Sequence, residues 1–312
     1  MPTLSNAEQQ KLERLLQDIV KSLSQETERG AVADYIPELA CIDPNQFGIA
    51  VALADGTLLQ AGDSQESFSV QSITKVFTLA MALDRIGAEL WQRVGREPSG
   101  LNFNSIIPLE IDKGIPRNPF VNAGAIVTTD VVLSGCQRGH MIEELLSFVR
   151  RAAEDSTIDI DASVAASEAS TGYRNQALAS FLRASGNLHH EPQVTLDAYF
   201  HQCALAMNCV QLARAGRFLI ISPETPNLIP PRRVRRINAL MMTCGLYDAA
   251  GDFAFRVGLP AKSGVGGGLL LIVPHVASVA IWSPALNAQG NSTLGLKAAE
   301  MLATEMGWSV FG

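Results

Sequence analysis

The order of the expected strands and helices is the feature that most restricts the fold of this 312-residue chain. Residues 47–53 and 57–62 have the short apolar pattern of a strand hairpin. Residues 268–273 and 276–282 show a second such pair near the other end of the chain. A parallel fold would alternate strands with helices, so this order excludes a doubly wound sheet. It predicts an α+β fold with one antiparallel sheet built from both chain ends.

The middle of the chain has the apolar spacing of helices, with three to four residues between buried positions. The expected helices cover residues 72–86, 121–134, 141–153, 175–184, 195–214 and 232–244. Two terminal helices, one with its apolar face at residues 12–23 and one over 291–306, should pack on the sheet. Residues 88–120 are rich in Gly, Pro and Asn and should be mostly loop.

These elements predict a single domain over residues 1–312 with two lobes. The sheet lobe is expected at roughly 1–70 and 245–312, and the helical lobe at roughly 71–244. A cleft between two lobes is a natural place for a ligand, so the candidate site is expected there.

Composition narrows the classes of function. Hydrophobic residues make up 47% of the chain, which is enough for a large core, and the net charge of −7 argues against a nucleic-acid partner. No run reaches the roughly 20 apolar residues of a membrane span. The N-terminal segment lacks an export signal, so a cytoplasmic location is expected.

Cysteine and histidine spacings give no sign of a metal site. The five cysteines form no C-x-x-C pair and are expected to be buried thiols in a reducing compartment; they are Cys41, Cys136, Cys203, Cys209 and Cys244. The histidines lack helical metal-ligand spacing. We therefore expect no metal and no cofactor, and any hydrolysis must use side-chain chemistry.

The first chemical motif is S-x-x-K, formed by Ser72 and Lys75. At the start of a helix this spacing places both side chains one turn apart on the same face. A serine hydroxyl needs a base to become a good nucleophile, and a lysine with a lowered pKa can be that base. The alternative is an ordinary helix cap by Ser72 with a solvated Lys75.

The second motif is Lys262-Ser263-Gly264, followed by a glycine-rich segment that leads into an apolar strand. Serine acyl-transfer enzymes of the penicillin-binding class pair S-x-x-K with such a K-S-G or K-T-G strand. Tyr173-Arg174-Asn175 also fits the Y-x-N motif of that class. A glycine-rich turn before a buried strand is the alternative interpretation of the second motif.

Four longer segments resemble the bacterial glutaminases, which belong to the serine-dependent β-lactamase-like superfamily. They are FVNAGAIVT (120–128), TLDAYFHQCAL (195–205), TCGLYDAAGDFAF (243–255) and VGLPAKSGVGGG (257–268). The similarity extends from about residue 30 to 308. It implies a β-lactamase-like fold and an amidohydrolase that converts L-glutamine to L-glutamate and ammonia without a cofactor. It also implies a homodimer or homotetramer.

The resemblance assigns roles to individual residues. Ser72 is expected to form a glutamyl-enzyme, with Lys75 as its partner and Tyr35, Tyr247 and Lys262 near the reacting centre. The residues expected to contact the substrate are Gln71, Ser72, Asn122, Glu168, Asn175, Tyr199, Tyr247 and Val265. The backbone N–H groups of Ser72 and Val265 are expected to stabilise the oxyanion.

Ordinary structural roles remain open for several of these residues. Asn122 could cap a helix, Glu168 could be a surface charge, and Tyr199 could be a half-buried core aromatic. Two other functions also remain: a penicillin-binding or β-lactamase-like hydrolase, against which the missing export signal argues, and a glutamine-binding protein without catalysis.

Overall fold

A computed structural model describes residues 4–134 and 138–312, and its centre is a five-stranded antiparallel sheet. The strand order is β2-β1-β8-β7-β6. The strands are β1 (Gly48–Leu53), β2 (Leu58–Gly62), β6 (Ala261–Ser263), β7 (Gly268–Val273) and β8 (Ala277–Trp282). Because β1 pairs with β8 along its whole length, the two ends of the chain meet inside one sheet. This confirms the α+β fold expected from the sequence.

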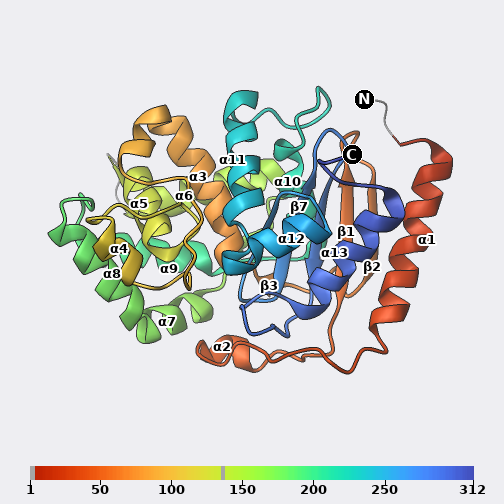
Figure 1. Ribbon diagram of the computed structural model, residues 1–312, viewed down its shortest axis with the longest axis horizontal. Helices are drawn as coiled ribbons and strands as arrows, with labels where there is room; N and C mark the ends of the chain where they lie inside the picture. The colour runs from red at the N-terminus through yellow and green to blue at the C-terminus, as the bar shows by residue number, and fades with distance from the viewer. Residues whose placement is uncertain (1–3, 135–137) are drawn as a thin grey trace.

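Two terminal helices cover the outer face of this sheet (Figure 1). They are α1 (Asn6–Leu23) and α13 (Thr293–Met306). Leu12, Leu16 and Ile19 on α1 are fully buried, which agrees with the amphipathic helix expected there. Ser5 caps α1 by accepting a hydrogen bond from the Glu8 amide, and the Glu8 carboxylate accepts one from the Ser5 amide.

The inner face packs on α10 (Cys209–Gly216) and, beyond it, on the helical part of the molecule. Gly216 permits this contact, because a Cβ there would lie 2.1 Å from Ser278 Oγ on β8. One continuous core joins the inner face of the sheet to the helices behind α10. Those helices include α3 (Thr74–Ile86), α5 (Asn122–Leu133), α6 (Arg138–Ala153) and α9 (Pro192–Cys203).

The remaining elements are short or lie at the periphery. A small three-stranded sheet has the order β3-β5-β4, with strands Phe68–Ser69, Leu205–Met207 and Asp159–Ile160. The other helices are α2 (Pro37–Ala40), α4 (Ile107–Ile111), α7 (Ala162–Thr171), α8 (Tyr173–Ala184), α11 (Pro231–Cys244) and α12 (Ala250–Arg256). Four 3-10 turns lie at Gln71–Ile73, Gly87–Gln92, Arg217–Leu219 and Tyr247–Ala249.

The structure corrects the single helix expected over residues 195–214. Strand β5 interrupts it, so α9 ends at Cys203 and α10 begins after Asn208. The Asn208 side chain accepts a hydrogen bond from the Gln211 amide, and Gln211 reaches back to the Asn208 amide. This capping box starts a new helix where apolar spacing alone had predicted continuity.

Helix α5 is the most enclosed helix of the helical part, since all of its residues from Asn122 to Leu133 are buried. Its apolar character on every side therefore reflects burial within the protein. Across residues 4–134 and 138–312, none of the helices has both the length and the apolarity needed to cross a membrane. Cys136 lies outside the described residues. Cys203, Cys209 and Cys244 are buried, free thiols, but Cys41 is exposed, so the expectation of a buried thiol is wrong at that position.

Candidate active site

Ser72 lies in a strained turn between β3 and α3. It belongs to the 3-10 turn Gln71–Ile73, and α3 begins only at Thr74, two residues later than expected. Gln71 has φ of +51°, a conformation that side chains other than glycine rarely adopt. Such strained residues concentrate at functional sites, and here the turn presents Ser72 to a cavity.

Lys75 lies on α3 next to this turn and is completely buried. Its Nζ donates hydrogen bonds to the Phe120 carbonyl at 3.2 Å and to Asn122 Oδ1 at 2.7 Å. Burial lowers the Lys75 pKa to about 8. A neutral amine has two N–H donors and one lone pair. Two acceptors can therefore hold Lys75 in place while its lone pair stays free to take a proton.

Lys262 comes from strand β6 on the opposite side of the site and is also completely buried. Its Nζ lies 4.6 Å from the centre of the Tyr247 ring and 5.9 Å from that of Phe120. It donates a hydrogen bond to the Ser263 carbonyl. Burial, and then the positive charge of Lys75, lower the Lys262 pKa well below its usual range. The two lysines are thus close enough to oppose each other's charge.

Tyr247 lies between Ser72 on one side of the site and Lys262 on the other. Burial raises the pKa of Tyr247 to about 12, while the neighbouring Ser72 and Ser263 hydroxyls oppose the rise. The Tyr247 hydroxyl itself is buried and has no hydrogen-bond partner among the described residues. Its backbone has φ of +57°, a second strained position beside the site. Its ring packs on Phe103 with 4.5 Å between ring centres. Tyr247 is therefore held as an un-ionised phenol beside Ser72.

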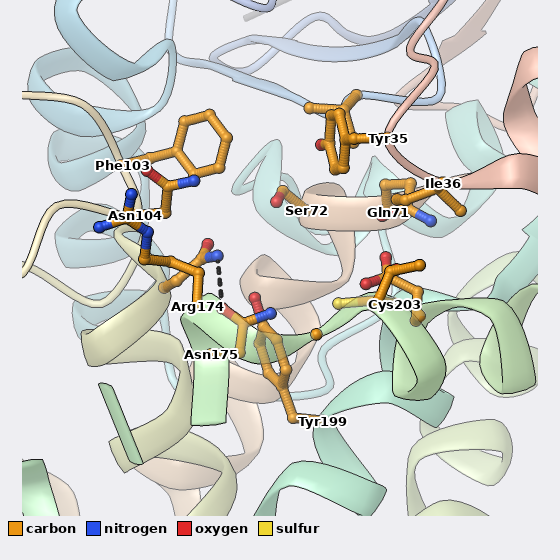
Figure 2. Close-up of a pocket in the computed structure, with 15 residues that line it drawn as sticks. Tyr35, Ile36, Gln71, Ser72, Phe103, Asn104, Arg174, Asn175, Tyr199 and Cys203 are labelled. Carbon is orange, nitrogen blue, oxygen red and sulfur yellow. Dashed lines mark hydrogen bonds between the residues drawn. The ribbon is translucent and has the colours of Figure 1, made fainter. Parts of the chain in front are cut away.

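A cavity of about 100 Å³ lies in front of Ser72. Figure 2 shows Ser72 near its centre, with Tyr35 above it, Asn175 and Tyr199 below it, and Asn104 and Arg174 to one side. The Asn122 side-chain NH2 group donates to Asn175 Oδ1 at 2.9 Å. This bond leaves the NH2 group of Asn175 available to a ligand.

Glu168 supplies a buried negative group to the same cavity. Its side chain belongs to α7 and only 8% of the residue is exposed. Burial raises the Glu168 pKa to about 7, although a hydrogen bond from Gln71 and the charge of Lys75 oppose this rise. Among the described residues, none forms an ion pair with Glu168, so the cavity offers a place for a ligand cation.

Val265 lies in the turn between β6 and β7. Its backbone N–H has no hydrogen-bond partner within the described part of the chain, and neither has that of Ser72. Gly264 brings the two segments together, because a Cβ there would lie 2.4 Å from the Val70 carbonyl oxygen and 3.4 Å from the Ser72 nitrogen. Two amides without a hydrogen-bond partner among the described residues thus belong to residues that line one cavity.

The structure brings together seven of the eight residues expected to contact a substrate, and the eighth, Tyr247, does not line the cavity. The cavity is lined by Gln71, Ser72, Asn122, Glu168, Asn175, Tyr199 and Val265. Lys75, Lys262 and Tyr247 lie beneath this lining, outside the cavity surface. Tyr35 is at the rim and is 53% exposed.

The structure also adds lining residues that we had not singled out, namely Phe103, Asn104, Arg174 and Cys203. Two of them stood inside motifs already recognised. Arg174 is the middle residue of Tyr173-Arg174-Asn175, and Cys203 lies one helical turn after Tyr199. The helical spacing of Tyr199 and Cys203 could have predicted that they share a face.

A serine before a buried lysine, facing an antiparallel strand with Lys-Ser-Gly, defines a serine hydrolase of the β-lactamase-like class. Comparison with known proteins identifies the family within this class. The sequence profile of the glutaminase family matches residues 30–311, and the chain belongs to that family.

Individual relatives agree with this assignment. A glutaminase of Agrobacterium fabrum is 58% identical over 307 residues, which cover 97% of this chain and 99% of the relative. A solved structure of the probable glutaminase ybaS superposes with a TM-score of 0.92 at 35% identity, covering 99% of both chains. The structure of Mglu in its glutamate form has a TM-score of 0.87 at 34% identity, covering 94% of this chain and 68% of that one.

Proposed function

We propose that this enzyme hydrolyses L-glutamine to L-glutamate and ammonia through a glutamyl ester on Ser72. The observation that carries the proposal is the cavity that Ser72 shares with a buried carboxylate and two side-chain amides. Mglu, which has a similar fold, is described in a glutamate form, and glutamate is the product of this reaction.

The two ends of the cavity match the two ends of glutamine. The α-ammonium group would pair with Glu168, whose buried carboxylate forms no ion pair with any described residue. The α-carboxylate would accept hydrogen bonds from Asn175 and Tyr199, with Asn122 orienting Asn175. These contacts leave the side-chain amide of glutamine directed at Ser72.

The reaction would then proceed in two steps. Ser72 Oγ attacks the amide carbon while Lys75 takes its proton, and the N–H groups of Ser72 and Val265 stabilise the oxyanion. The C–N bond breaks, and nitrogen leaves as ammonia with the proton from Lys75. Water then attacks the ester, giving glutamate and regenerating the serine hydroxyl, with Lys75 again moving the proton.

The remaining residues have supporting roles in this proposal. The Tyr247 hydroxyl would donate a hydrogen bond to Ser72 Oγ during the reaction, and Lys262 Nζ lies 4.6 Å from the centre of the Tyr247 ring and keeps the ring in place. Gln71 donates a hydrogen bond to Ser69 Oγ at 3.0 Å and fixes the strained turn. Tyr35 would close the cavity from its rim.

The proposed setting is the cytoplasm, with the enzyme acting as a homodimer or homotetramer. Separate buried thiols such as Cys203, Cys209 and Cys244 are typical of proteins in reducing compartments. The assembly is supported by membership of the glutaminase family. Size-exclusion chromatography with light scattering would measure the mass of the assembly, and a monomer would contradict this part.

Ammonia release from L-glutamine is the direct test. The wild-type enzyme should release ammonia, and Ser72→Ala should retain less than about 1% of that rate, because loss of a nucleophile typically costs far more than 10²-fold. Calorimetry should show that Ser72→Ala still binds glutamine. A variant that keeps more activity than this would remove Ser72 from the nucleophile role. Acylation of the wild type by nitrocefin, without ammonia release from glutamine, would contradict the proposal as a whole.

A further inference from the structure

A second cavity of about 300 Å³ adjoins the one in front of Ser72. The two cavities share the side chains of Tyr35, Phe103, Asn104 and Val265. Neither Glu168 nor any other residue proposed to hold the amino-acid end of glutamine lines the second cavity. The reacting centre therefore lies at a junction between two spaces with different linings.

The residues between the two cavities are closely packed. Phe103 packs on Tyr247, and its carbonyl accepts a hydrogen bond from the Asn122 amide at 2.9 Å. On the far side, Gly290 brings a turn against this pair, because a Cβ there would lie 3.9 Å from the Tyr247 ring and 4.0 Å from the Phe103 ring. This packing supports the second cavity as a formed part of the fold.

The linings of the two cavities also differ in chemistry. Leu286 and Ala288 give the second cavity apolar surface, and Gln289 adds a polar group. Of the described residues that line it, only Asp248 carries a charge. Asp248 is exposed, and its carboxylate has no hydrogen bond or ion pair within residues 4–134 and 138–312. A solvated carboxylate beside apolar lining such as Leu286 and Ala288 favours a ligand with a short apolar chain and a terminal cation.

The position of Val265 indicates which part of the substrate the second cavity would hold. With the amino-acid end of the substrate at Glu168 and Asn175, and the oxyanion at the Val265 amide, the second cavity, which Val265 also lines, is the neighbouring space open to a substituent on the scissile nitrogen. We propose that the second cavity is a leaving-group site that admits γ-glutamyl amides whose nitrogen carries a substituent. Asp248 selects among them for substituents that end in an ammonium group.

This inference rests on the proposed function and uses the same chemistry. Ser72 Oγ forms the ester as the C–N bond breaks, and the substituted nitrogen leaves as an amine that gains the serine proton. Water then cleaves the ester to glutamate. Only the leaving group changes, so no further reactant is required.

Two substrates of equal length test the site. N5-(3-aminopropyl)-L-glutamine ends in an ammonium group, and N5-butyl-L-glutamine ends in a methyl group at the same position. Glutamate release gives kcat/KM for both and for L-glutamine. The wild-type enzyme should cleave both amides and prefer the cationic one by about fivefold, the scale of a partly exposed ion pair. Molar salt should reduce this preference because it screens the charge.

Variants of the enzyme distinguish the effect of the Asp248 charge from the effect of the volume of the second cavity. Asp248→Asn should bring the ratio of the two kcat/KM values close to one. The matched control Asp18→Asn makes the same change on the exposed side of α1, far from the cavity, and should keep the wild-type ratio. Ala288→Phe should lower kcat/KM for both substituted amides relative to glutamine, because it fills the cavity.

The outcomes distinguish this inference from the proposed function. A wild-type enzyme that hydrolyses glutamine but neither amide would overturn the leaving-group site alone. Equal rates for both amides at low salt, or a salt-independent preference, would overturn the role of Asp248 without requiring any variant. Failure to hydrolyse glutamine itself would contradict the proposed function.

Discussion

The two sides of the active site each supply one fully buried lysine, but the surroundings of these lysines differ. On the helical side, Lys75 contacts two oxygen acceptors, Phe120 O and Asn122 Oδ1, and its pKa falls to about 8. On the sheet side, Lys262 lies against the rings of Phe120 and Tyr247, and burial and the charge of Lys75 hold its pKa well below its usual range. The same residue type at the same burial therefore has oxygen acceptors on one side and aromatic rings on the other.

This difference indicates that the two lysines have different roles in the reaction. A lysine with a pKa near 8 can gain and lose a proton during a reaction near neutral pH. Lys262 instead lies against the Tyr247 ring and donates to the Ser263 carbonyl, contacts that suit a positioning group. We infer that Lys75 on the helical side changes protonation, and that Lys262 on the sheet side positions Tyr247.

The largest effect should come from the helical side. Lys75→Ala should lower kcat by about 10³-fold or more, and Lys75→Arg should not rescue it, because arginine cannot lose its proton near neutral pH. In the wild type, Lys75 is protonated below its pKa of about 8 and cannot accept the serine proton. Activity should therefore rise with pH up to about that value. Steady-state kinetics across pH checks both results, and an active arginine variant would show that position 75 supplies only charge.

A smaller effect is expected from the sheet side. Lys262→Met keeps the chain length but removes the donor, and should lower kcat by roughly 10²-fold. Because this change leaves the proposed base in place, the rise of activity near pH 8 should persist in the variant. Loss of that rise would reverse the assignment and make Lys262 the titrating lysine.

Next in size is the effect on substrate selectivity within the cavity. Wild-type enzyme should prefer glutamine to 4-carbamoylbutanoate, which lacks the α-amino group, and Glu168→Gln should shrink this preference by roughly 10- to 100-fold. The reason is that the substrate ammonium would enter without its partner. Competition kinetics with both substrates measures the ratio, and an unchanged ratio would make Glu168 a bystander.

The smallest effect concerns the scaffold beneath the sheet side. Asn208→Ala removes the cap of α10, which packs on β1 and β8, and should lower the free energy of unfolding by about 1 kcal/mol. Denaturant unfolding measures this, and kcat at low temperature should stay near the wild-type value. A large drop in kcat with unchanged stability would show that α10 influences the chemistry directly.

The sequence by itself determined the fold class and the chemical motifs. Strand patterns at both chain ends predicted one antiparallel sheet, and β1 pairing with β8 confirms it. These predictions succeeded because they depend on local patterns of polarity, glycine and spacing, which any single segment displays. The break in the predicted helix at 195–214 was missed because apolar periodicity dominated a local cap at Asn208.

Only the tertiary structure decided the environment of each functional group. The sequence could not show that Lys75 and Lys262 are both desolvated, that Val265 lies in a turn, or that Asp248 faces a second cavity. Those properties depend on segments more than 100 residues apart, such as Lys75 with Lys262, meeting at one point. A pKa responds to burial and to neighbouring charges in space, and neither is encoded in the spacing of residues along the chain.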